Sequence, residues 1–410
     1  MSIYAGIFNA TLNPAQLNMK SLASTIMRFR PNGSAPLFAM TAVTGKTKAK
    51  AVNHGYFSKV MVFSKCAATA AALAAAGTIT VDDTSGFVKG MVLLNTRTDE
   101  NMRVLAVNSA TELAVTRQFG RLAAADVTIG DVFVCVGNAH EQGSPRPTSR
   151  SIQAVYIENY TQIIRNAWAL TDTARASYAE AGYSNIAETK RDCMDFHSMD
   201  IEQAMIFGQK YMGMYESKPI HATGGIMDTV RQYAPGNVDA APATTSYDDI
   251  VDMVLPMFSQ SADVGDPNSR VVFCDTTAMR TFQDIGREYG EVSMTMDQSG
   301  YGMRFGRFDF FKGTLYLKEH PMFSAMGLPP GLALVVDVPA VKLAYLDGRE
   351  SIQENYTPAS GGSNEAGNGV DAQGGSITAE FAVELLNPQG CGIITNLVAA
   401  KKKVYHTTVV

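Results

Sequence analysis

The longest periodic stretch of the chain covers residues 185–213, where apolar and polar side chains recur at helical spacing. On a wheel turning about 100° per residue, one side collects apolar residues and the other polar ones. The apolar side consists of Met194, Ile201, Ala204, Met205, Gly208 and Met212, and the polar side of Arg191, Asp192, Asp195, Glu202, Gln209 and Lys210. Asn185 with Glu188 signals a helix start, and Gly213 signals its end. At about 1.5 Å per residue, the predicted helix is roughly 40 Å long, which suits a subunit that holds distant contact surfaces apart.

A different pattern occupies residues 78–137, where short apolar runs are separated by turn residues such as Gly86, Gly90 and Gly130. The runs are residues 78–81, 91–95, 102–107, 112–116 and 131–136. Val132, Val134 and Val136 show the two-residue period of a half-buried strand. Short strands at close, regular spacing predict a small antiparallel β-barrel or sandwich, which we place at residues 77–140.

Extended, aromatic-containing segments flank this unit on both sides, at residues 46–64 and 151–169. We interpret them as the outgoing and returning arms of one long loop, residues 46–169, with the β-barrel at its far end. Residues 1–30 have little to bury and predict an arm that docks elsewhere, and we place the N-terminal arm at residues 1–45. A terminal helix packed on its own domain is the alternative.

The C-terminal half alternates strand and helix patterns, which predicts an α+β fold. Expected elements include a helix begun by Thr245 or Ser246 and shortened or kinked at Pro256, a helix at residues 277–289, and a hairpin of residues 305–311 and 314–319. The long helix belongs to a domain at residues 170–240, and a second domain covers residues 241–350. Residues 351–410 return through further strands, with a mobile Gly-rich loop at 361–375 and a C-terminal tail.

Composition narrows the class of protein. The net charge of −5 argues against a dedicated nucleic-acid binder with a strong basic stripe. Five cysteines without any Cys-x-x-Cys pair predict reduced, buried thiols in a cytosolic setting. We expect no signal peptide, since the N-terminus lacks a charged region followed by an apolar run, and no membrane span, since no apolar run approaches about 20 residues.

No catalytic, metal or cofactor site is predicted. Gly45-Lys46-Thr47 lacks the glycine that a phosphate loop requires five residues earlier, because Met40 stands there. The six histidines form no pair at metal-ligand spacing, and His197 is expected to be a satisfied core residue. The chain therefore has the pattern of a structural framework rather than of an enzyme.

Several stretches, taken in order, resemble the major capsid proteins of tailed bacteriophages, in the branch that carries a β-barrel insertion in its extended loop. They are residues 37–46 (LFAMTAVTGK), 78–90 (TITVDDTSGFVKG), 116–120 (TRQFG), 137–143 (GNAHEQG), 159–163 (NYTQI), 200–208 (DIEQAMIFG) and 223–226 (TGGI). The resemblance implies an N-terminal arm, an extended loop, a peripheral domain with a long spine helix, and an axial domain. We expect this chain to lack the long coiled-coil N-terminal extension that some relatives use as a built-in scaffold.

As implied by this resemblance, we expect hexamers and pentamers forming an icosahedral shell around double-stranded DNA. Portal, scaffold or decoration proteins are expected partners, with assembly in the host cytoplasm. Weak, sequence-independent DNA contacts are assigned to Arg28, Arg30, Lys401, Lys402 and Lys403. Three alternatives stay open: a cytosolic binding module with the β-barrel as its ligand site, a protein compartment without a genome, and an enzyme whose site is assembled in space.

Overall fold

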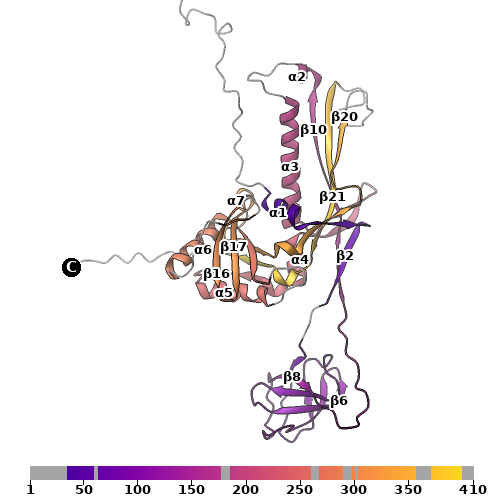
Figure 1. Ribbon diagram of the computed structural model, residues 1–410, viewed down its shortest axis with the longest axis vertical. Helices are drawn as coiled ribbons and strands as arrows, with labels where there is room; N and C mark the ends of the chain where they lie inside the picture. Colours follow the sequence, from indigo (N-terminus) through magenta and orange to yellow (C-terminus); the bar gives the residue numbers. More distant parts are fainter. Residues whose placement is uncertain are drawn as a thin grey trace, which may run out of the picture. The chain divides into compact units, whose positions relative to one another are not determined.

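The computed structural model describes residues 35–59, 63–176, 185–259, 267–289, 298–300, 303–356 and 371–398. The chain divides into two compact units (Figure 1). One unit, Phe57–Ile157, is called here the insertion unit. The other, called the body, contains the segments before and after it. Strands β2 (Asn53–Ser58) and β9 (Val155–Tyr160), where the chain passes from one unit to the other, pair with each other.

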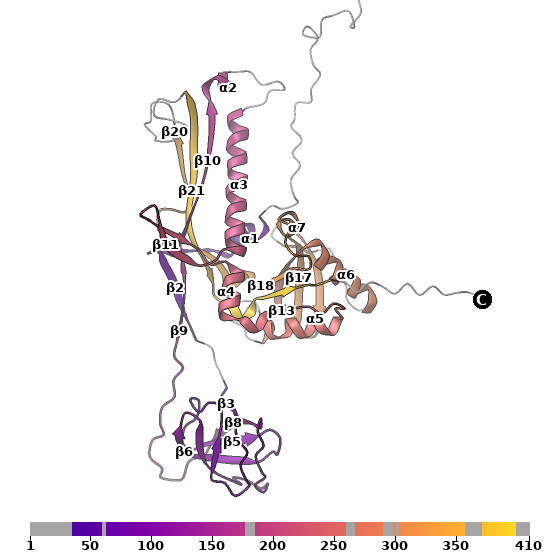
Figure 2. The same cartoon turned by 180° about the vertical axis from the view of Figure 1, so that it is seen from behind.

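A five-stranded sheet of the body is built around the long strand β21 (Ala372–Leu385). Strand β10 (Gln162–Thr171) pairs along one edge of β21, while β19 (Val341–Leu346) and β20 (Ile352–Tyr356) share the other. Strand β1 (Lys46–Ala49) runs parallel to β19. Helix α3 (Asn185–Phe207) packs along β10, as both views of the ribbon show (Figures 1 and 2).

Helix α3 confirms the predicted long helix but ends at Phe207 rather than at Gly213. At Gly208 the helical hydrogen-bond pattern stops, because its carbonyl oxygen accepts the N–H of Gly225 at 2.8 Å. Glycine allows this close approach, since a Cβ would lie 2.5 Å from the carbonyl oxygens of Ala204 and Thr223. The chain therefore turns at this glycine, and the rest of the predicted helix enters a hairpin of β11 (Tyr211–Tyr215) and β12 (Lys218–Ala222). The predicted polar face is also wrong at Glu202, which is fully buried, and the apolar face at Met194, which is half exposed.

The second sheet of the body has seven strands, in the order β13-β22-β18-β14-β17-β16-β15. Their bounds are Val238–Ala240, Gly392–Thr395, Ala333–Val336, Ser269–Cys274, Gly313–Glu319, Met303–Phe310 and Gln298–Gly300, respectively. Side chains alternate between two cores: Phe273 of β14 joins the core shared with α3, and its neighbours Val272 and Cys274 join the core on the other face. This layered arrangement confirms the α+β class.

Helices α5 (Tyr247–Val254) and α6 (Thr276–Tyr289) contribute to the core on that other face. Ser246 begins α5 as predicted, in a reciprocal capping box with Asp249. The α-helix ends at Val254 and continues as a 3-10 turn, Leu255–Phe258, because Pro256 has no N–H to donate. The predicted hairpin is confirmed as β16 and β17.

The remaining helices are short. They are α1 (Pro36–Thr44), α2 (Asp172–Ala176), α4 (Ile226–Tyr233), α7 (Pro321–Ala325) and the 3-10 turns Pro235–Asn237, Val338–Ala340 and Pro388–Gly390. Helix α1 lies in the predicted N-terminal arm and packs on the body, with Leu37 and Met40 fully buried. The rest of that arm lies outside the described residues.

The predicted mobile loop at 361–375 is wrong at its C-terminal end, because residues 372–375 belong to β21. Gly375 pairs with Trp168 of β10 and Asn355 of β20. A Cβ on this glycine would lie 2.7 Å from Nε1 of the Trp168 ring and 2.4 Å from the carbonyl oxygen of Glu354. Glycine is therefore required in this strand for the close approach of both neighbours rather than for flexibility. Residues 361–370 lie outside the described residues.

The insertion unit contains one antiparallel sheet with the strand order β3-β8-β5-β6-β7-β4. The strands are β3 (Lys65–Ala67), β4 (Thr78–Thr80), β5 (Met91–Asn95), β6 (Asn101–Ser109), β7 (Glu112–Thr116) and β8 (Val132–Asn138). Its core contains Ile79, Leu93, Met102, Leu113 and Phe133. A single bridge, between Ala68 and Val81, joins the two ends of this order.

The valine pattern of β8 confirms a half-buried strand but not the expected face. Phe133 is fully buried, whereas Val132 and Val136 are 37% and 55% exposed. A strand turns alternate residues to opposite sides, so only one of the two sets enters the core. Burying the larger Phe133 removes more apolar surface from water than burying a valine. Val132 and Val136 therefore lie on the outer face of the sheet.

Candidate functional site

The residues assigned to weak DNA contact lie outside the described part of the chain: Arg28, Arg30, Lys401, Lys402 and Lys403. Within the described ranges, no group of three or more His, Cys, Asp and Glu side chains is placed to hold a metal ion. His197 is buried, and its Nδ1 lies 2.8 Å from Oδ1 of Asn166, as expected for a satisfied core histidine. Among the helices described, none is both long and apolar enough to cross a membrane.

A buried polar cluster joins α1 to α3 and α7. The N–H groups in the first turn of α1 have no acceptor within the helix, and the N-cap residue Ala35 provides no side-chain cap. Glu202 of α3 supplies the cap, since Leu37 N–H donates to its Oε1 at 2.8 Å and Phe38 N–H to its Oε2 at 2.6 Å. His320 Nε2 lies 2.8 Å from the same Oε1, and both side chains are fully buried. One carboxylate therefore fixes a segment that lies more than 160 positions away in the sequence.

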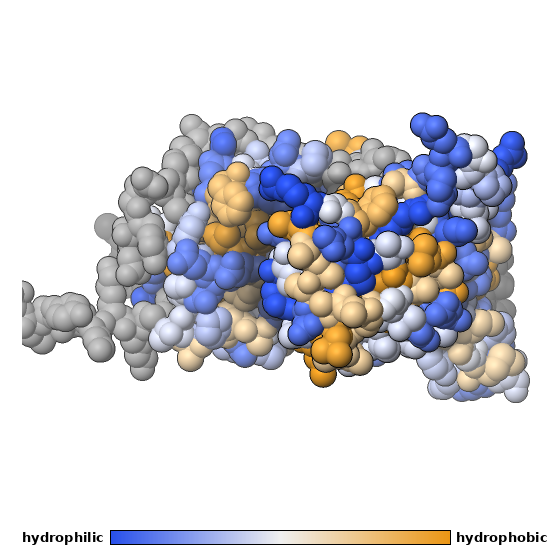
Figure 3. All heavy atoms as spheres, turned by 90° about the horizontal axis from the view of Figure 1, so that it is seen from below, coloured by the Kyte–Doolittle hydropathy of each residue, from blue (hydrophilic) through white to orange (hydrophobic). Residues whose placement is uncertain are grey.

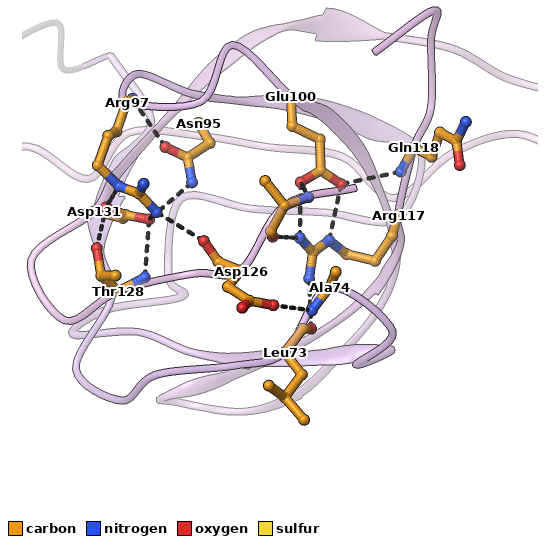
Figure 4. Close-up of polar contacts among 11 residues, drawn as sticks. Leu73, Ala74, Asn95, Arg97, Glu100, Arg117, Gln118, Asp126, Thr128 and Asp131 are labelled. Atoms are coloured by element: carbon orange, nitrogen blue, oxygen red, sulfur yellow. Dashed lines mark hydrogen bonds and ion pairs between the residues drawn. The ribbon is translucent and has the colours of Figure 1, made fainter. Parts of the chain in front are cut away.

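Two further clusters order the loops at one end of the insertion unit (Figure 4). Arg117 binds the fully buried Glu100 through two parallel bonds of 2.9 and 2.7 Å, and it also donates to the carbonyl oxygen of Leu73 at 3.1 Å. Glu100 accepts the N–H groups of Gln118 and Ala125, both at 3.1 Å. A bidentate, charge-assisted pair of this kind is among the stronger polar contacts in proteins.

The second of these clusters surrounds the carboxylate of Asp131. Arg97 donates to it at 2.6 and 2.9 Å, Asn95 at 3.0 Å, and Thr128 through both its N–H and its hydroxyl. These hydrogen bonds, that of Arg97 foremost, lower the pKa of Asp131. For Glu100, burial alone would raise the pKa, but the bonds from Arg117, Ala125 and Gln118 outweigh it and the pKa is lowered. Both carboxylates are thus held ionised in the folded state.

A cavity of about 320 Å³ lies in the body beside α4. Phe207, Met227, Leu328 and Leu332 give it an apolar lining, and Arg231 is its basic residue. None of the buried clusters above lines this cavity. Their chemistry is that of structural support, because each one joins segments distant in sequence through a buried carboxylate.

Large apolar side chains are exposed at many positions of the described surface, and Figure 3 shows apolar residues reaching one face among polar ones. The densest set in the body belongs to the β11–β12 hairpin: Tyr211, Met212, Met214, Tyr215 and Ile220. In the insertion unit, Leu73 and Ile129 are more than 70% exposed, on the loops that Arg117 and Asp131 hold. A contiguous exposed apolar set, such as that of the hairpin, is typical of surfaces that bind other proteins.

The comparison with known proteins decides which class of protein carries these surfaces. A family described as "SU10 major capsid protein" matches residues 6–398. The chain belongs to the SU10 major capsid protein family. It is also 58% identical to the major capsid protein of Pseudomonas phage PaMx41 over 416 residues, which cover 99% of both chains.

Two solved structures are also similar to this chain. One is from Mycobacterium phage Adephagia, with 9% identity and a TM-score of 0.49, covering 97% of this chain and 100% of that one. The other is from Microbacterium phage Oxtober96, with 13% identity and a TM-score of 0.48, covering 93% of this chain and 96% of that one.

Family membership confirms the predicted capsid fold and the main functional hypothesis. The SU10 family member described here is a structural subunit of a phage head, and it assembles into a multimeric shell of the virion. The alternative of a ligand-binding module is not supported. Within this subunit, Glu202 and Glu100 hold distant segments in place through their hydrogen bonds.

Sequence reasoning missed all three buried clusters. Glu202 carried a weak signal, because it stands between Ile201 and Ala204 at the edge of the apolar side of the helix. Glu100 and Arg117 carried none, since their pairing depends on the fold of the insertion unit.

Proposed function

We propose that the chain assembles as hexamers and pentamers into an icosahedral shell that encloses double-stranded DNA. The observation that carries this proposal is the family match across residues 6–398. The exposed apolar hairpin and loops support it, because contacts of the obligate kind are apolar at their centres and often exceed about 2,000 Å². In this proposal the protein has no catalytic role and assembles in the host cytoplasm, with portal and scaffold or decoration proteins as further partners.

The proposed domains keep the predicted bounds: an N-terminal arm at 1–45, an extended loop at 46–169, a peripheral domain at 170–240, an axial domain at 241–350 and return strands at 351–410. Residues 1–30 of the arm and residues 46–169 of the loop cross onto adjacent subunits. The insertion is proposed to be a closed β-barrel that includes β3 (Lys65–Ala67), a strand that lies outside the predicted bounds of 77–140. The bridge between Ala68 and Val81 supports this, with Thr69 N–H donating to the carbonyl oxygen of Thr80 and Asp82 N–H to that of Ala67, both at 3.0 Å.

DNA contact is proposed to be weak, salt-sensitive and independent of sequence. Arg28, Arg30, Lys401, Lys402 and Lys403 are its proposed residues. Reversing these charges would then impair DNA packaging without preventing shell assembly.

Electron microscopy of the purified chain tests the proposal. We expect closed shells built from rings of six and five subunits, and we expect particles from infected cells to contain double-stranded DNA. A monodisperse monomer that captures a small ligand would support a binding module instead. Closed shells that never contain a genome would support a protein compartment.

A further inference from the structure

The β11–β12 hairpin is held in one conformation by its turn. Tyr215 pairs with Lys218, so only Glu216 and Ser217 form the turn, with φ angles of 48° and 62°. Two positive φ angles are typical of the type I′ turn, whose twist matches that of the strands. Residues other than glycine adopt such angles uncommonly, so this tip is built at a conformational cost.

The hairpin presents apolar side chains to solvent. Tyr211, Met212, Met214 and Tyr215 are 56%, 61%, 68% and 66% exposed, and Ile220 is 46% exposed. A two-stranded hairpin has no core of its own and is marginally stable in water. Tyrosine and methionine are enriched in protein interfaces. The hairpin therefore has the composition of a contact element that another protein surface covers.

The cavity beside α4 begins where this hairpin leaves the body, since Phe207 and Gln209 line it and β11 starts at Tyr211. Its volume of about 320 Å³ is large enough for one aromatic side chain. Arg231 is exposed and forms no ion pair with any residue that the structure describes. Asp228, the other charged lining residue, already accepts the N–H of Lys210 at 3.1 Å. The cavity thus combines an apolar lining with the guanidinium of Arg231, which has no ion-pair partner among the described residues.

The hairpin tip is complementary to this cavity. Tyr215 and Met214 are apolar, and the adjacent Glu216 is exposed and unpaired within the described part of the chain. Five strand residues place the tip about 17 Å from the base of the hairpin. Because the cavity lies at that base, the tip is directed away from the cavity of its own chain.

We propose that the hairpin tip of one copy docks into the cavity of a neighbouring copy, with Tyr215 on the apolar floor and Glu216 paired with Arg231. The two surfaces are different patches of the same chain, so the contact is heterologous, and repeating it closes a ring when the rotation allows. This inference rests on the proposed assembly into rings of subunits and names the residues that make one of its contacts.

A charge swap in the full-length chain tests the contact. Glu216→Arg and Arg231→Glu each place like charges together, and each is expected to raise the protein concentration needed for assembly about tenfold or more. The double variant Glu216→Arg/Arg231→Glu restores the pair in reversed order and assembles like the unmodified chain. A matched control, Glu216→Arg/Lys218→Glu, keeps the net charge but not the pair across copies, and it assembles poorly.

Assembly of each variant is measured by light scattering and by electron microscopy. The thermal transition of each variant is recorded to show that it is folded. Single variants that assemble like the unmodified chain would overturn the contact, and so would a double variant that fails to recover. If the unmodified chain forms no shells, the proposed function itself fails, which is a separate result.

Cross-linking gives an independent measurement. The Glu216→Cys/Arg231→Cys variant, once assembled and oxidised, is expected to give a ladder of covalent multimers on a non-reducing gel. Monomers alone on that gel would contradict the contact.

Discussion

Replacing Glu202 by alanine is expected to lower the free energy of unfolding by about 3–5 kcal/mol, the usual cost of breaking a buried charged cluster. The N–H groups of Leu37 and Phe38 lose their acceptor, and His320 Nε2 loses its partner. Buried donors left without acceptors cost about 1–3 kcal/mol each. We expect α1 to detach from the body before the sheets unfold.

Chemical denaturation gives the free-energy change, and hydrogen exchange at Leu37 and Phe38 reports whether α1 detaches. Glu202→Gln keeps one acceptor oxygen and should cost less than alanine. Arg191→Ala, an exposed change on the same helix, should stay within about 0.5 kcal/mol of the unmodified chain. If Glu202→Ala cost no more than Arg191→Ala, the capping role would be wrong.

Arg117→Met is expected to destabilise the insertion unit by about 3–5 kcal/mol at neutral pH, because it leaves the carboxylate of Glu100 buried without its cation. The carbonyl oxygens of Leu73 and Ala125 also lose the Arg117 side chain that donates to both of them. Amide exchange in residues 68–77 and 117–130 should accelerate, while exchange in α3 stays unchanged. Arg121→Met, an exposed arginine in the same loop, is the matched control.

The same cluster makes the insertion unit sensitive to acid. The pKa values of Glu100 and Asp131 are lower in the folded chain than their ordinary values of 4.5 and 3.8. Their contribution to stability is therefore present above the unfolded-state pKa and is lost as the pH falls through the folded-state pKa. We expect the protection factors of amides in the insertion unit, which are corrected for the intrinsic pH dependence of exchange, to fall as the pH is lowered from about 5 to 3. The Glu100 part of this dependence is expected to disappear in Arg117→Met.

Local elements were predictable where a single signal decides them. The capping box of Ser246 and Asp249, the break at Pro256 and the hairpin of β16 and β17 all follow from residues within a few positions of each other. These features depend on backbone donors and turn chemistry that act locally. The sequence therefore carries them without knowledge of the fold.

Prediction failed where a distant contact outweighs the local pattern. The long helix stops at Gly208 because its carbonyl oxygen accepts the N–H of Gly225, seventeen positions later. Glu202 belongs to the polar side of the helical wheel by type, but it is buried because α1 brings two N–H donors to it. Val132 and Val136 follow the two-residue period of a strand, but they are exposed because the larger Phe133 on the opposite side is buried in the core.

The sequence predicted that the chain has a surface for copies of itself, but not which residues form that surface. The extended arms predicted from the sequence indicate a chain that contacts copies of itself, but they do not indicate which residues are exposed. Met212 was assigned to the buried side of a helix and lies instead on an exposed strand. Only three residues separate this hairpin from the preceding helix, and its turn of Glu216 and Ser217 lacks the Asn-Gly or Asp-Gly signal that would have identified it.

Hydrogen exchange of the chain before and after assembly tests most directly whether its exposed apolar surface is completed by copies of itself. Protection should increase in residues 211–222 and in the loops that carry Leu73 and Ile129, while the core strands β14 and β18 change little. Equal exchange of these segments in the free subunit and in the shell would show that other surfaces hold the assembly together.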